Sequence, residues 1–179
     1  MGPMPVYALG DLVPRIDPTA FVHPEAVVIG DVWIGADSSI WPGAVLRGDG
    51  GGHIRIGART SVQDNAVIHC TPECPTIVGS DCVVGHIAHL EGCTIEDNAL
   101  VGSGSVVLHD AIVRSWSVVA ANAVVRNRME VPSGAIAVGV PATIKPDRAD
   151  ADSIRDGVQE YLAKSAAYKA GLRAVERNT

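Results

Sequence analysis

Residues 95–125 read IEDNAL VGSGSV VLHDAI VRSWSV VAANAV V, and the spacing within this stretch decides the fold. An aliphatic residue occupies every sixth position, and a small residue commonly stands four places after it. A helix does not produce this period, because its apolar positions recur every three or four residues. Each hexad therefore predicts a short strand and a tight turn, and three hexads predict one triangular coil of a parallel β-solenoid.

The same spacing continues toward the N-terminus, with a one-residue shift before Ile95. Two ten-residue intervals each hold one hexad with four extra residues, and they predict loops at residues 48–53 and 70–75. Insertions in a solenoid gather on one face, which is often the binding face. The upstream core positions are Val28, Ile34, Ile40, Leu46, Ile56, Val62, Ile68, Val78, Val84 and Leu90.

The composition fits one domain with thin, regular layers. The 179 residues are 47% hydrophobic but only 4% aromatic, so the core must consist of Val, Ile, Leu and Ala. The hexads fade after Val125, and prolines close the last coil, since proline cannot donate to a sheet. We expect an all-β solenoid over residues 1–146 and an α-helix within residues 147–179 that packs on it.

The expected helix is amphipathic. Its apolar and flanking positions follow a helical period, and Asp152 or Ser153 is the expected N-cap. Gly157 and Gly171 weaken the prediction of its ends. The residues of the pattern are Ile154, Val158, Tyr161, Leu162, Ala166, Tyr168, Lys169, Leu172, Arg173 and Val175.

Charge and cysteine content limit the partners and the compartment. A net charge of -6 opposes binding to a phosphate backbone, so nucleic acid is not an expected partner. Neither a leader nor a membrane span is evident, and we expect a cytoplasmic protein. Free thiols are then expected at Cys70, Cys74, Cys82 and Cys93, most simply as buried packing groups; Cys70, next to His69, could instead touch a metal.

Three segments carry a more specific signal. Residues 40–49 read IWPGAVLRGD, residues 60–65 read TSVQDN and precede Ile68-His69, and residues 84–93 read VGHIAHLEGC. This combination resembles the γ-class carbonic anhydrases. The resemblance implies a left-handed β-helix, a homotrimer, and a divalent metal shared between subunits, with zinc as the first choice and Fe(II) or Co(II) as alternatives.

The resemblance also implies the ligands. His69 matches a ligand of one subunit, and His86 matches the ligand donated by its neighbour. The third position holds Glu91 where the family has histidine, and His89 stands two residues earlier. Glu91 follows core residue Leu90 as His69 follows Ile68, so the two should stack on adjacent coils, whereas His89 would have to reach back. Glu91, His89 and the absence of a tight metal site remain the three alternatives.

Other residues take roles from the same resemblance. Gln63 is expected beside the metal-bound solvent, and Asp49 belongs either to the same polar network or to a turn. Arg47 and Asp64 are expected to form an ion pair between subunits. The three remaining histidines, His23, His53 and His109, are expected to be ordinary surface or hydrogen-bonded groups.

The implied reaction is the reversible hydration of CO2 to bicarbonate by a metal-bound hydroxide. Zinc lowers the pKa of bound water from 15.7 to about 7. An anionic Glu91 should make that water less acidic, and the loop at residues 48–53 has no glutamate for proton transfer, so we expect a slow enzyme. Two other functions stay open: an acyl-CoA-dependent acyltransferase, and a non-catalytic trimeric binding or scaffold protein.

Overall fold

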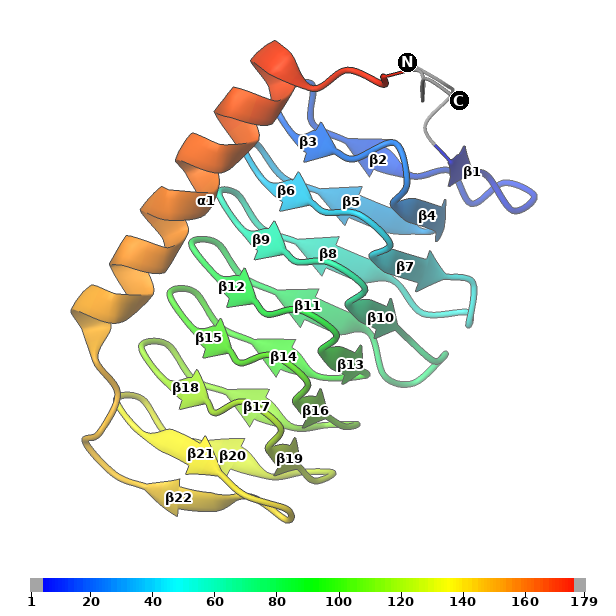
Figure 1. Ribbon diagram of the computed structural model, residues 1–179. Coiled ribbons are helices and arrows are strands. Elements are labelled where there is room, and N and C mark those ends of the chain that lie inside the picture. Colours follow the sequence, from blue (N-terminus) through cyan, green and yellow to red (C-terminus); the bar gives the residue numbers. More distant parts are fainter. Residues whose placement is uncertain (1–4, 176–179) are drawn as a thin grey trace.

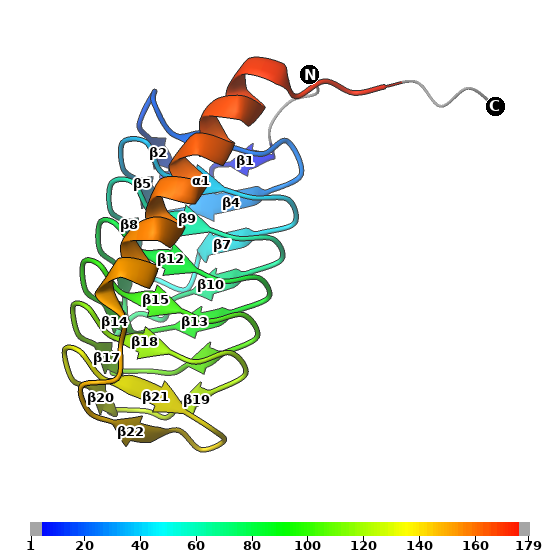
Figure 2. The same cartoon turned by 60° about the vertical axis from the view of Figure 1, so that its left-hand side comes forward.

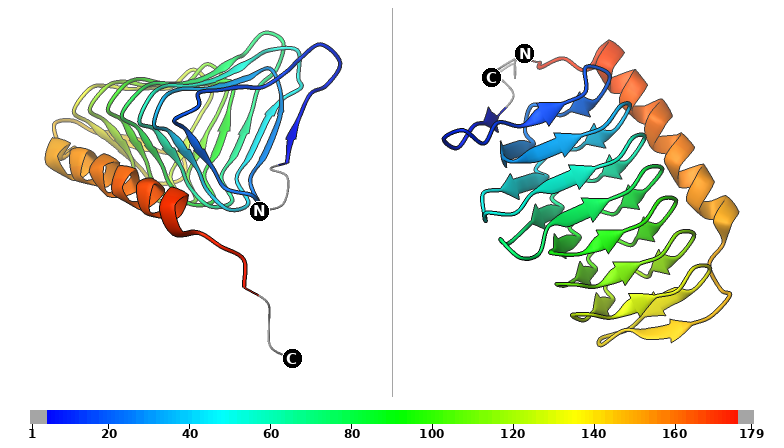
Figure 3. Two further views of the ribbon diagram at one scale, coloured as in Figure 1. Left: turned by 90° about the horizontal axis from the view of Figure 1, so that it is seen from above. Right: turned by 180° about the vertical axis from the view of Figure 1, so that it is seen from behind.

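The computed structural model describes residues 5–175, which wind into a left-handed parallel β-helix with one C-terminal helix (Figure 1). Seen from above, the coils form a triangular outline with three walls (Figure 3). Each wall is one sheet, and the chain visits the three walls in turn. The solenoid predicted from the hexads is confirmed.

We name each sheet after its first strand. The β1 sheet contains β1 Val6–Tyr7, β4 Val27–Gly30, β7 Val45–Gly48, β10 Val67–His69, β13 His89–Glu91, β16 Val106–Val107 and β19 Val124–Val125. The β2 sheet contains β2 Arg15–Ile16, β5 Val32–Ile34, β8 Ile54–Ile56, β11 Thr76–Val78, β14 Thr94–Ile95, β17 Ile112–Val113 and β20 Glu130–Val131. The β3 sheet contains β3 Phe21–Val22, β6 Ser39–Ile40, β9 Ser61–Val62, β12 Val83–Val84, β15 Leu100–Val101, β18 Val118–Val119, β21 Ile136–Val138 and the antiparallel β22 Thr143–Lys145.

The hexad positions form the core. Every aliphatic residue of the pattern is buried, from Val28 through Ile68 to Val125, and successive coils stack them in register. The small residues four places later are buried too, because they turn inward where the chain bends around a corner. They are Ser38, Ala44, Ala66, Ala88, Ala99, Ser105, Ala111, Ser117 and Ala123.

Most corners contain one residue in the left-handed backbone region. Glycine, asparagine and aspartate supply many of these positions, which is the usual choice at positive φ. Ile87 differs, because a β-branched residue at a φ of 52° is strained by roughly 1–2 kcal/mol. Its side chain is also 61% exposed.

The insertions gather at one corner, between the β1 and β2 sheets. Residues 8–14, 49–53 and 70–75 all connect a strand of the first sheet to a strand of the second. These loops project from the same edge of the solenoid (Figure 1). The expected concentration of insertions on one face is therefore confirmed.

The C-terminal helix α1 spans Ala151–Gly171, so two details of the prediction are wrong. Its N-cap is Asp150, whose carboxylate accepts from the backbone N–H groups of Asp152 and Ser153 at 3.0 and 3.4 Å. Asp150 keeps an extended backbone, and the helical turn starts directly after it. At the other end, Leu172 is the C-cap with an extended backbone, and Arg173 and Val175 also lie beyond the last helical residue.

Helix α1 runs along the β3 sheet (Figure 2). Ile154 and Val158 are buried against this wall, and the Trp41 ring lies 5.4 Å from that of Tyr161 and 5.0 Å from that of Tyr168. The helix thus covers a wall of its own chain. The expected division of the chain into a solenoid over residues 1–146 and a helical segment over residues 147–179 stays a prediction. Within residues 5–175, no helix has the length and hydrophobicity needed to span a membrane.

All four cysteines are free thiols. Cys70, Cys82 and Cys93 are buried in the core, and Cys74 is partly exposed in the loop at residues 70–75. Packing is therefore the role of three of them, Cys70 included. Burial raises the pKa of Cys82 and of Cys93 to about 12, so these thiols stay protonated at neutral pH.

The exposure of Cys74 and the burial of the other three cysteines predict selective alkylation. The thiolate is the reactive form, so iodoacetamide should modify Cys74 in the folded protein and leave the other three cysteines unmodified until denaturant is added. Peptide mass spectrometry of a time course measures the four rates. Cys74→Ser should remove the labelling of the folded state, and modification of Cys82 as fast as Cys74 would contradict the burial described here.

Candidate metal centre

The candidate site begins with two neighbouring strands at the corner between the β1 and β2 sheets. Strands β10 and β13 pair in parallel, and their register places His69 directly beside Glu91. The His69 Nδ1 and Glu91 Oε1 atoms lie 3.0 Å apart. The stacking expected from the hexad register is present, because both residues follow a buried core position.

Glu91 is the centre of a histidine cluster. Its Oε2 atom lies 3.2 Å from His89 Nε2, and its Oε1 atom lies 3.9 Å from His109 Nε2. His89 does reach back to the carboxylate despite its position on the strand. His109 was not among the predicted site residues, although the coil register places it one coil beyond Gly92, next to the cluster.

These contacts favour the anionic form of Glu91. The hydrogen bond with His69 holds the pKa of this carboxyl below its usual value; partial burial opposes the shift, and contacts with His89 and the charge of His109 add to it. In a folded chain without metal, Glu91 is therefore a carboxylate at neutral pH. A carboxylate is the form in which glutamate binds a metal.

Asp49 and Arg47 lie near the second ring nitrogen of His69, Nε2. His69 Nε2 lies 3.2 Å from Asp49 Oδ1 and 3.2 Å from Arg47 Nη2, and Arg47 Nε lies 3.3 Å from Asp49 Oδ1. Asp49 is thus close to the candidate ligand within one chain. Arg47 makes these contacts with its own chain, and its expected pairing with Asp64 of another subunit stays a prediction.

Backbone contacts fix this corner. Thr76 is buried, and its hydroxyl donates to the carbonyl oxygen of His69 and accepts from Gly92 N at 2.8 Å, which ties two coils together. Gly92 has a φ of 64°, and a Cβ atom there would lie 2.6 Å from the Cβ of Cys74 and 2.7 Å from His109 Cδ2. Only glycine lets these two side chains approach beside Glu91.

His86 and Gln63 lie at a different corner, between the β3 and β1 sheets. Residues 63–66 and 85–88 are equivalent turns of consecutive coils, so Asp64 lies next to His86. His86 Nδ1 is 2.8 Å from Asp64 Oδ2, and its Nε2 is 3.4 Å from the Tyr161 hydroxyl of α1. A carboxylate on one ring nitrogen orients the other, as is usual for metal-binding histidines.

The donor chemistry fits a divalent metal only in part within one chain. Among residues 5–175, no three His, Cys, Asp or Glu side chains are arranged to hold an ion. His69 and Glu91 are nevertheless adjacent, and two histidines with one carboxylate are a set that zinc and non-haem iron accept. One chain thus offers two neighbouring donors at one corner and an oriented histidine at another.

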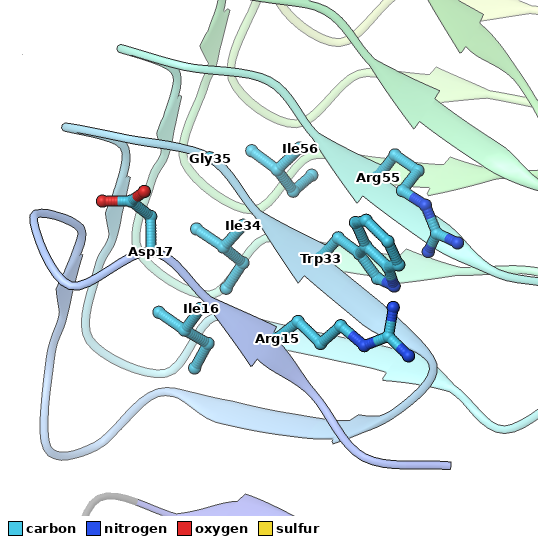
Figure 4. Close-up of a pocket in the computed structure, with 8 residues that line it drawn as sticks. All are labelled: Arg15, Ile16, Asp17, Trp33, Ile34, Gly35, Arg55 and Ile56. Atoms are coloured by element: carbon cyan, nitrogen blue, oxygen red, sulfur yellow. The ribbon is translucent and has the colours of Figure 1, made fainter.

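The clearest pocket lies elsewhere. It has a volume of about 390 Å³ and lies on the β2 sheet, where Trp33 is held between the guanidinium groups of Arg15 and Arg55 at 4.5 and 4.2 Å (Figure 4). Asp31 accepts from both Trp33 Nε1 and Arg55 Nη1 at 3.1 Å. None of the predicted site residues lines this pocket, and its Arg55 side chain forms an ion pair with Asp31.

Comparison with known proteins places these features in a family. Residues 14–48 and 92–127 match the model "Bacterial transferase hexapeptide (six repeats)". Over 162 residues, 87% of this chain, the sequence is 39% identical to gamma carbonic anhydrase 2, mitochondrial, of Arabidopsis thaliana, and the match covers 56% of that protein. The chain therefore spans little more than half the length of this curated relative.

Two solved structures match nearly end to end. A hexapeptide transferase family protein from Anaplasma phagocytophilum has a TM-score of 0.88 and 34% identity, covering 92% of this chain and 98% of that one. A putative acetyltransferase from Bacillus cereus has a TM-score of 0.88 and 32% identity, covering 92% and 96%. With its hexad core and its similarity to the Arabidopsis protein and to these two structures, the chain belongs to the hexapeptide-repeat family that includes the γ-class carbonic anhydrases.

Proposed function

We propose that the chain forms a homotrimer with a divalent metal, most simply zinc, at each subunit interface, and that it catalyses the reversible hydration of CO2 to bicarbonate. The observation that carries this proposal is the separation of the donors within one chain. His69 and Glu91 lie at the corner between the β1 and β2 sheets, and His86 lies at the corner between the β3 and β1 sheets. Two copies are needed to bring the three donors together.

The outer surface of the β1 sheet supports association. The register aligns Val27, Val45, Val67, His89, Val106 and Val124 in one outward column, in which five of six residues are valine. Val67 is 39% exposed in the single chain. An apolar column beside a candidate site is typical of an interface. Contact between two different corners is heterologous, and it closes into a ring under three-fold symmetry.

The ion itself would act as a Lewis acid that lets a water molecule give up its proton near neutral pH. Around it, His69 and Glu91 would hold the ion from one subunit and His86 from the next, with Asp64 keeping the His86 ring in place. Gln63, on the turn before Asp64, would orient the reacting water or the bicarbonate. Glu91 adds a negative charge where histidine is neutral, so we expect slow hydration.

Location in the cytoplasm stays a prediction.

One observation favours an acyltransferase as the second candidate. The Bacillus cereus structure that matches 92% of this chain carries the name putative acetyltransferase. Titration of coenzyme A in a calorimeter separates the two functions. Saturable binding of coenzyme A by a protein without bound metal would favour acyl transfer, and a metal-containing protein without such binding would favour CO2 hydration.

The third ligand can be tested by metal content. Protein purified without chelator should contain about one metal per subunit, Glu91→Ala should lose it, and His89→Ala should keep it, because Glu91 shares the register position of His69. Elemental analysis by mass spectrometry measures this. Glu73→Ala removes an exposed carboxylate from the neighbouring loop and serves as the control.

The result has two informative alternatives. Loss of metal in His89→Ala with retention in Glu91→Ala would assign the ligand to His89 and make Glu91 its hydrogen-bond partner. A wild-type trimer that contains no metal would contradict the proposed reaction and favour a binding or scaffold function.

Gln63→Ala tests the orienting role. We expect kcat/KM for CO2 hydration to fall roughly tenfold to a hundredfold, as for other residues that contact a metal centre indirectly, with metal content unchanged. Stopped-flow measurement with a pH indicator gives the rate. Equal activity of wild type and variant at equal metal content would remove Gln63 from the site.

A further inference from the structure

Ile87 combines two unfavourable properties in one residue. It is the only β-branched residue with positive φ among residues 5–175, at 52°. The same place in other coils is taken by Gly43, Asn65, Gly104 and Asn122, which tolerate this backbone conformation. Strain of this kind persists only where something else over-determines the conformation.

Neighbouring coils hold the backbone of this turn, since Ile87 N–H donates to the Asp64 carbonyl oxygen at 2.9 Å, but the side chain finds little cover within the chain. The side chain of Ile87 is 61% exposed, and it lies along Gly104 of the next coil, where Cδ1 would be 3.8 Å from an added Cβ atom. Asparagine at this turn would relieve the strain and remove an exposed apolar group. The choice of an exposed isoleucine at this turn therefore points to a contact outside the single chain.

The position of Ile87 identifies the partner as a second copy. It follows His86 directly, and in the proposed trimer that histidine must approach the His69–Glu91 pair of a neighbour. Ile87 stands on the same turn, so it approaches the same neighbour. The outward valine column of the β1 sheet, Val67 included, runs beside that pair and supplies an apolar surface.

We propose that Ile87 is the hydrophobic anchor of the subunit interface, buried against the β1 sheet of a second copy next to the metal donors. This inference rests on the proposed shared site and adds the residue that fixes how the donated histidine is presented. Burial of the side chain offsets the backbone strain, and it removes water from one side of His86. The strained turn thus couples assembly to completion of the site.

Ile87→Asn separates this role from a local one. Relief of strain should leave the fold intact, with an unfolding midpoint of the dissociated chain equal to or above that of wild type. Association should weaken roughly tenfold per interface, because an apolar contact is lost. A dilution series followed by sedimentation velocity and mass photometry measures association, and circular dichroism measures unfolding.

Two further variants make the test specific. Ile87→Leu keeps an apolar side chain and should associate as wild type does. Trp116→Asn makes the same change at another positive-φ corner, with a φ of 61°, where the ring packs on Arg155 of α1, and it should not alter association.

The outcomes also separate this inference from the proposed function. Wild-type and Ile87→Asn trimers that dissociate at the same concentration would overturn the anchor role and leave the shared site standing. A wild-type trimer without metal, weakened by Ile87→Asn, would support the anchor and contradict the metal chemistry. A wild-type monomer at all concentrations would overturn both.

Discussion

Burial of one aliphatic side chain in every six residues is the constraint on which the rest of this structure depends. The chain has almost no aromatic residues with which to fill a thick core, so Val, Ile and Leu must stack directly on those of the next coil. A slip of one residue would turn each of these side chains toward water, and the register is therefore fixed along the whole solenoid. The same register places His69 beside Glu91, since each follows a core residue.

The chain can change in length only outside the repeated core positions. Loops that leave the β1 sheet and return to the β2 sheet can lengthen without moving a core residue, and the chain uses this at residues 49–53 and 70–75. Polar and reactive side chains gather at that edge: Asp49 from the first loop, Cys74 from the second, and His109 from a turn two coils beyond the second loop. The repeat forms the rigid walls, and the loops and turns at this corner carry the polar and reactive side chains.

The sequence was a good guide wherever periodicity decided the outcome. The core positions, the two loops and the stacking of His69 on Glu91 all follow from counting in sixes. Counting in sixes places His109 one coil beyond Gly92, but it does not give the direction of this turn side chain, on which its closeness to Glu91 depends. The N-cap at Asp150 was missed by two to three residues, since several polar residues near the helix start could each serve as a cap. Contacts between copies, such as the expected pair of Arg47 and Asp64, lie beyond any repeat, which describes only how a chain packs on itself.

Glutamate at position 91 needs more hydrogen-bond donors from its surroundings than a neutral histidine would. A neutral histidine can stand on an exposed strand with few partners, whereas a partly buried carboxylate needs donors. His69, His89 and His109 surround Glu91, and they hold its pKa below the usual value in the metal-free chain. A metal ion bound by Glu91 would compete with those hydrogen bonds, because both carboxylate oxygens already contact histidine ring nitrogens. The cluster that keeps the carboxylate charged therefore also weakens metal binding relative to a site in which the ligands have no partner but the ion.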